Sequence, residues 1–268
     1  AARLFLGSRP HRPSEDFHDL AESLSGDPAR PRRVLCLDYR GRGRSEWDKD
    51  WRKYDVRIEA NDVLQVLTAA GLHKAVFVGT SRGGLIAMAL GALHPTILAG
   101  VVLNDVGPAI EGKGLMRIKG YVGKLPAPRT LQEGADLLRQ LSDSQFPAFT
   151  QEQWLKQAAG TWREESGGLV LRYDPLLMKT LEALDLEMPL PDLWPLFEGL
   201  KPFPVLAIRG ANSDLLSAAT LKAMQEAHPR LKAITVPGQG HAPLLEGDLI
   251  DAIKGLIAEA ERACAVKA

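Results

Sequence analysis

The chain has 268 residues, of which 45% are hydrophobic and 25% charged, an ordinary composition for a protein with a sizeable core. Its 33 Lys and Arg residues equal its 33 Asp and Glu residues, so the overall charge indicates neither a nucleic-acid partner nor an anionic membrane. Cys36 and Cys264 are too far apart to indicate a disulfide framework or a metal-ligand motif. Without an apolar run of about 18 residues or a signal-peptide pattern, we expect a cytoplasmic protein with no membrane span.

Short apolar segments alternate with helical patterns over the first 106 residues. Apolar runs predict strands at residues 3–7, 33–38, 75–78 and 99–105. Helices are predicted at residues 14–24 and 55–70, and from residue 84 to the His94-Pro95 pair. Such alternation predicts an α/β fold in which helices cover both faces of a mostly parallel, twisted sheet.

The pattern changes between residues 107 and 201 and then returns. This segment has many prolines, helical stretches at 131–141 and 151–159, and three of the five tryptophans. We interpret residues 107–201 as a helical cap inserted into a core formed by residues 1–106 and 202–268. Most of its aromatic residues should form the interior of the cap, and the candidates for substrate contact are Met116, Trp154 and Tyr173. Strands at 204–210 and 232–237 and helices at 220–228 and 249–263 complete the predicted core.

A G-x-S-x-G motif lies between a predicted strand and a predicted helix. It reads Gly79-Thr80-Ser81-Arg82-Gly83. A serine at a sharp strand-to-helix turn is the geometry of a nucleophile elbow, in which flanking glycines allow a strained backbone and close packing. We therefore predict that Ser81 is a catalytic nucleophile.

A serine nucleophile needs a base with a pKa near neutrality, and histidine fits this need. His241 lies in the loop after the predicted strand 232–237, at the sheet edge that should carry the other catalytic groups. The imidazole in turn needs a carboxylate partner. We assign this role to Asp214, which follows strand 204–210. Asp105 follows strand 99–105 at the same edge and is the rival, although we favour a turn or loop-capping role for it.

Four segments together make the chain resemble an α/β-hydrolase-fold serine hydrolase with a helical cap. They are the elbow, the D-x-R-G-x-G-x-S turn at residues 38–45, the segment 209–214 and the segment 238–241. The order Ser81, Asp214, His241 is the one expected for such enzymes. The resemblance extends from about residue 34 to about residue 257. It implies hydrolysis of carboxylic esters or lactones without a cofactor or a metal, and a structural role for Arg42 and Arg44.

An oxyanion hole requires two hydrogen-bond donors. The backbone N–H of Arg82 is one candidate, supplied by the elbow itself. The second donor should come from the loop after the strand at residues 3–7, but the His-Gly pair usual in the family is missing there. The N–H of Ser8 is our candidate, with Arg9 as the next choice.

Other functions are compatible with the same residues. Haloalkane dehalogenases and epoxide hydrolases of this fold use an aspartate at the elbow, and Ser81 argues against both. Hydrolysis of a C–C bond in a ring-cleavage product uses the same triad and stays open. A ligand-binding or catalytically weak hydrolase homologue is the alternative from another class. The predicted partner is a small-molecule ester or lactone.

Overall fold

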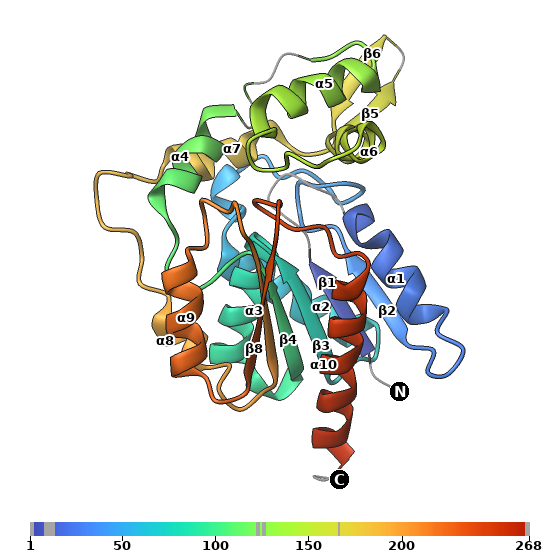
Figure 1. Cartoon of the computed structure of the whole chain (residues 1–268), viewed down its shortest axis with the longest axis vertical. Coiled ribbons are helices and arrows are strands. Elements are labelled where there is room, and N and C mark those ends of the chain that lie inside the picture. The colour runs from blue at the N-terminus through green and yellow to red at the C-terminus, as the bar shows by residue number, and fades with distance from the viewer. Residues whose placement is uncertain (1–2, 8–13, 122–123, 125–126, 166, 266–268) are drawn as a thin grey trace.

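The computed structural model describes residues 3–7, 14–121, 124, 127–165 and 167–265. Its central feature is a six-stranded sheet with the order β2-β1-β3-β4-β7-β8, in which every pairing is parallel. The strands are β1 (Arg3–Gly7), β2 (Arg33–Leu37), β3 (Ala75–Thr80), β4 (Leu98–Asn104), β7 (Val205–Gly210) and β8 (Leu231–Val236). The predicted parallel α/β sheet is thus confirmed, and all its strand ends that carry candidate groups lie at one edge (Figure 1).

Helices cover both faces of this sheet. They are α1 (His18–Ser25), preceded by the 3-10 helix η1 (Ser14–Phe17), α2 (Val56–Ala69), α3 (Arg82–Leu93), α9 (Ala218–Ala227) and α10 (Asp248–Ala265). Two hydrophobic clusters result, one shared with α2, α3 and α9 and the other with α1 and α10. Strand β3 contributes to both clusters, because Phe77 points to the first and Val76 and Val78 to the second, as the two-residue period of a strand requires.

The segment between β4 and β7 contains mostly short helices. They are α4 (Gly112–Tyr121), α5 (Leu131–Ser142), α6 (Gln151–Thr161), the 3-10 helix η4 (Pro175–Leu177), α7 (Met178–Glu182) and α8 (Trp194–Glu198). A two-stranded antiparallel hairpin, β5 (Trp162–Glu165) with β6 (Gly168–Leu171), follows α6 directly and was not predicted. In Figure 1 all of these except α8 lie above the carboxyl ends of the core strands. We call the described residues 112–182 the cap.

Helix α8 belongs spatially to the core. Phe197 and Leu200 are completely buried in the same cluster as α3, and a side chain at Gly199 would lie 2.7 Å from the backbone of Ala92. Helix α8 thus packs on the core, although it falls within residues 107–201, which we interpreted as the cap. The exact division of the chain into domains stays a prediction.

A short connection fixes the cap to the turn after β2. Arg42 and Tyr173 form an antiparallel bridge, and on either side of it Gly43 N–H donates to the Arg172 carbonyl (2.8 Å) and Asp174 N–H to the Gly41 carbonyl (2.8 Å). The D-x-R-G-x-G-x-S turn is thus a docking point for the cap.

Among the described residues, no helix is long and apolar enough to cross a membrane.

Candidate active site

Ser81 lies at the sharp turn between β3 and α3. Its φ of 52° is in the left-handed region, which is strained for a residue with a side chain and typical of a nucleophile elbow. A Cβ at Gly79 would lie only 2.4 Å from the carbonyl carbon of Gly83, so a glycine is required where the strand and the helix approach each other. The N–H of Ser81 donates to the carbonyl of Asn104 at 3.0 Å, which fixes the elbow to the neighbouring strand β4.

His241 lies in the loop after β8 and faces the serine. Its Nε2 is 3.0 Å from Ser81 Oγ, and its Nδ1 is 2.8 Å from Oδ2 of Asp105. All three side chains are at least nine-tenths buried. Because a carboxylate only accepts hydrogen bonds, Asp105 fixes the imidazole proton on Nδ1 and leaves Nε2 free to accept the proton of Ser81.

The structure corrects our assignment of the carboxylate partner. Asp105, at the end of β4, contacts His241, whereas Asp214 forms a two-point ion pair with Arg117 of α4 (2.6 and 3.0 Å). Burial raises the pKa of Asp214, but hydrogen bonds and charge from Arg117, with a hydrogen bond from Gln145, outweigh it and lower the pKa overall. Both aspartates follow strands that are neighbours in the sheet, so their position in the sequence does not distinguish them.

Asp105 is held by a complete set of donors. Its Oδ1 accepts the N–H of Gly210 (2.8 Å), and its Oδ2 accepts the hydroxyl of Ser213 (2.6 Å) as well as the imidazole proton. Ser213 in turn accepts the N–H groups of Leu215 and Leu216 (both 3.2 Å). The loop after β7 therefore orients Asp105, and the sequence analysis did not predict this role for Ser213.

Only one of the two predicted oxyanion donors lies in the described part of the chain. Arg82 is the first residue of α3, where a backbone N–H has no acceptor within the helix. Its guanidinium points elsewhere and donates to Glu59 (2.5 Å) and to the carbonyl of Tyr54 (2.6 Å). Ser8 and Arg9 fall outside the described residues.

The same Glu59 also binds Arg42 of the turn after β2. Arg42 and Glu59 are fully buried, and their Nη1 and Oε1 atoms are 2.6 Å apart. Burial lowers the pKa of Arg42. A single buried carboxylate thus connects the helix that follows Ser81 to the turn on which the cap docks, which supports the structural role that we expected for Arg42.

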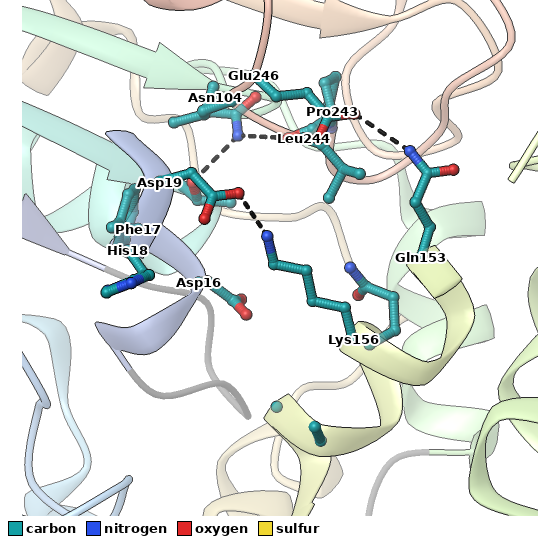
Figure 2. Close-up of a pocket in the computed structure, with 15 residues that line it drawn as sticks. Asp16, Phe17, His18, Asp19, Asn104, Gln153, Lys156, Pro243, Leu244 and Glu246 are labelled. Carbon is teal, nitrogen blue, oxygen red and sulfur yellow. Dashed lines mark hydrogen bonds and ion pairs between the residues drawn. The ribbon is translucent and has the colours of Figure 1, made fainter. Parts of the chain in front are cut away.

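A cavity of about 320 Å³ lies between the core and helix α6 (Figure 2), and Ser81, Asp105 and His241 are not among the residues that line it. Thr80, Asn104 and Pro243 line it on the core side and are near neighbours in sequence of Ser81, Asp105 and His241, respectively. Gln153 and Lys156 of α6 form the opposite wall. Dashed lines in Figure 2 mark the hydrogen bond from Gln153 to Glu246 and the ion pair between Lys156 and Asp19. Carboxylate, amide and ammonium groups therefore surround a cavity whose exposed lining is otherwise mostly apolar.

The three residues predicted for the substrate pocket do not line this cavity. Trp154 is buried in the cap against Phe146 and Phe149, with ring centroids 6.2 and 5.1 Å away. Tyr173 is buried in the bridge to Arg42, and the side chain of Met116 is 57% exposed. These positions fit packing and surface roles.

No group of three or more His, Cys, Asp or Glu side chains in the described part of the chain is arranged to hold a metal ion.

Comparison with known proteins places the chain in a family. Residues 5–252 match the model of the alpha/beta hydrolase family, and the chain belongs to it. It is 37% identical over 244 residues to the 3-hydroxybutyrate-oligomer hydrolase of Cupriavidus necator, an alignment that covers 87% of this chain and 80% of the relative. It is 27% identical over 208 residues to the 2-(acetamidomethylene)succinate hydrolase of Mesorhizobium japonicum, covering 78% of this chain and 71% of that one.

Solved structures agree with this placement. An alpha/beta hydrolase from Novosphingobium aromaticivorans has a TM-score of 0.88 and 37% identity, with 96% of this chain and 89% of that chain covered. The structure of E-2-(acetamidomethylene)succinate hydrolase has a TM-score of 0.78 at 24% identity, over 96% of this chain and 91% of the other, and shows the common fold. The protein is thus a hydrolase of the α/β fold, as the motifs predicted.

Proposed function

We propose that the protein hydrolyses carboxylic esters of small molecules through an acyl-enzyme on Ser81. The observation that carries the proposal is the continuous hydrogen-bonded series from Ser81 Oγ to His241 Nε2 and from His241 Nδ1 to Asp105 Oδ2. This arrangement supplies a nucleophile, a general base and a group that orients the base, which is what acyl transfer requires.

In the acylation step, Ser81 Oγ attacks the ester carbonyl carbon while its proton passes to His241 Nε2. The negative charge that develops on the carbonyl oxygen is stabilised by the N–H of Arg82 and by a second donor, for which Ser8 remains our candidate. When the tetrahedral intermediate collapses, the C–O bond breaks and His241 gives its proton to the leaving alcohol. Asp105 stabilises the imidazolium throughout without taking its proton.

In the deacylation step, water replaces the alcohol. His241 accepts a proton from the water as the oxygen attacks the acyl carbon, and the second tetrahedral intermediate then releases the acid and restores Ser81. The step needs no oxidant, metal or cofactor, because all the proton transfers pass through the same imidazole. A lactone follows the same route, with the alcohol and the acid remaining in one molecule.

The substrate class that we propose is a short ester of a hydroxy acid. The similarity to a relative named 3-hydroxybutyrate-oligomer hydrolase, over most of both chains, supports it.

The proposal is tested by steady-state hydrolysis of p-nitrophenyl butyrate and of the linear 3-hydroxybutyrate dimer and trimer. We expect turnover by the wild-type protein and a loss of about 10⁴-fold or more in kcat for Ser81→Ala. Equal rates for the two proteins would refute the role of Ser81. A vinylogous 1,5-diketone is assayed in parallel. Its cleavage in the absence of ester turnover would assign C–C hydrolysis instead, and tight binding without turnover of any of these compounds would assign a binding role.

A further inference from the structure

Gln145 is the residue at which the cap reaches the catalytic histidine. It lies between α5 and α6, and its side chain is buried although glutamine is usually exposed. Its Oε1 accepts the backbone N–H of His241 at 3.1 Å. This bond comes from the cap and is made to the same residue whose side chain contacts Ser81 and Asp105.

Gln145 also contacts the loop after β7. Its backbone carbonyl accepts the side-chain amide of Asn212 at 3.1 Å, and its own side-chain amide hydrogen-bonds Asp214. Asp214 is ion-paired with Arg117 of the cap helix α4. One residue therefore connects the loop of His241 with the loop that holds Asp105, and both of these with the cap.

The local sequence is adapted to this contact on both sides. A Cβ at Gly240 would lie 2.5 Å from the side chain of Gln145, so the loop must have a glycine there for Gln145 to approach. On the cap side, the next residue, Phe146, is buried against Phe149 and Trp154, and the N–H of Gln145 donates to the carbonyl of Ser142 at the end of α5. The aromatic interior of the cap thus holds Gln145 in place.

We propose that Gln145 is a positioning residue for His241, through which the placement of the cap determines the alignment of the imidazole with Ser81. The backbone N–H of His241 is buried with its acceptor, so removing that acceptor leaves an unpaired donor that pulls the loop toward another partner. A small displacement of the imidazole lengthens the Ser81 contact and reduces the rate of proton transfer. The proposal rests on the proposed function, since it assumes that His241 is the base.

The test compares two Gln145 variants with a matched control. Gln145→Met keeps the length of the side chain and removes both hydrogen bonds. Gln145→Glu keeps the acceptor for the N–H of His241 and is made together with Asp214→Asn, so that the new carboxylate does not face that of Asp214. Gln132→Met changes an exposed glutamine of the same cap, which bonds only Asp136 in the described part of the chain. With p-nitrophenyl butyrate, we expect Gln145→Met to lower kcat about tenfold or more while KM changes little. Gln145→Glu should recover much of this loss, and Gln132→Met should behave as wild type.

Two outcomes would overturn the proposal: a kcat of Gln145→Met equal to that of the control, or equal losses in Gln145→Met and Gln145→Glu. Thermal unfolding followed by circular dichroism checks that each variant is folded. If Gln145→Met does not fold, Gln145→Glu decides, because a folded Glu variant with near wild-type kcat supports the role of the acceptor and a folded but inactive one contradicts it.

A second measurement separates this proposal from the proposed function. The low-field proton NMR signal of the His241 Nδ1–H, identified by its loss in His241→Gln, reports the bond to Asp105 without any substrate. If the wild-type protein does not hydrolyse esters, the proposed function fails. The NMR signal then still shows whether Gln145 positions the imidazole of His241. A signal that is shifted or weakened in Gln145→Met but unchanged in Gln132→Met supports positioning. A signal that is unchanged in both contradicts it.

Discussion

Oδ2 of Asp105 lies 2.8 Å from Nδ1 of His241, and this contact joins the end of β4 to the loop after β8. The two strands are not neighbours, because β7 lies between them. The contact is possible since Asp105 has a φ of 56° directly after the strand and is fixed by Gly210 and Ser213 of the β7 loop.

Replacing this carboxylate should disable the enzyme without unfolding it. Asp105→Asn places an amide opposite Nδ1 and favours the wrong imidazole tautomer, so we expect kcat to fall by about 10⁴-fold. Asp214→Asn, at the residue that the sequence suggested, should lose far less activity, because Asp214 contacts Arg117 and Gln145 instead of the imidazole. Steady-state kinetics of the two variants on one ester make the comparison. Equal losses, or the larger loss in Asp214→Asn, would contradict the assignment.

The elbow should not tolerate a side chain at Gly79. In Gly79→Ala the new Cβ would meet backbone atoms at 2.4 to 2.5 Å, and backbone cannot rotate away as a flexible side chain does. We expect the free energy of unfolding to fall by about 2 kcal/mol or more. Gly255→Ala is the control, because nothing lies within 4 Å of its Cβ and alanine favours the helix α10 by about 0.5–1 kcal/mol. Urea titrations of both variants measure these changes, and a harmless Gly79→Ala would show that the close approach is not required.

Glu59 should be important for stability, because it neutralises two arginines in the interior. Glu59→Gln leaves Arg42 and Arg82 without the carboxylate that each contacts at 2.6 and 2.5 Å. Breaking a buried pair by removing one partner costs about 3–5 kcal/mol. The matched surface change is Glu226→Gln, which removes an exposed ion pair with Lys222 and should change stability by less than about 1 kcal/mol. Urea unfolding of the two variants side by side tests the difference, and similar values would argue against a stabilising role of the buried carboxylate.

His228 should make the fold sensitive to mild acid. Its Nε2 is 2.9 Å from the carbonyl of Leu200, and its Nδ1 accepts the N–H of Arg230 at 3.2 Å, so only the neutral ring fits. Burial lowers the pKa of His228 below its ordinary value of 6.5. The unfolded chain therefore takes up this proton at a higher pH than the folded chain, and the free energy of unfolding decreases as the pH falls through 6.5.

His228→Gln removes this titration while keeping a polar side chain. The stability of the variant should accordingly depend less on pH between 7 and 5 than that of the wild-type protein. Urea unfolding at a series of pH values gives both slopes. Parallel slopes would mean that other groups cause the acid sensitivity.

Much of the core could be predicted from the sequence because its signals are local. The apolar run before Ser81 forms β3, and the predicted helix at residues 55–70 is α2, with the side chain of Asp55 accepting the N–H of Arg57 at its start. Local signals were also sufficient to select Ser81 and His241, which the structure brings into contact.

Which aspartate contacts His241 depends on distances between separate segments of the chain, and the sequence alone does not give these distances. Asp105 and Asp214 follow neighbouring strands, and the strained turn at Asp105 and the ion pair of Asp214 with the cap decide between them. The same holds for Gln145, whose contact with His241 joins residues 96 positions apart and has no local pattern. The hairpin β5–β6 was missed because its strands have only four residues each.

The most direct test of the account is to find where an ester leaves its acyl group. Rapid mixing of the wild-type protein with p-nitrophenyl butyrate, followed by acid quenching and mass spectrometry of peptides, locates a butyryl adduct. We predict an adduct on Ser81 that forms within the first turnover, disappears as the ester is consumed and is absent from Ser81→Ala. Turnover without an adduct on Ser81, or an adduct on another residue that persists in Ser81→Ala, would contradict the account.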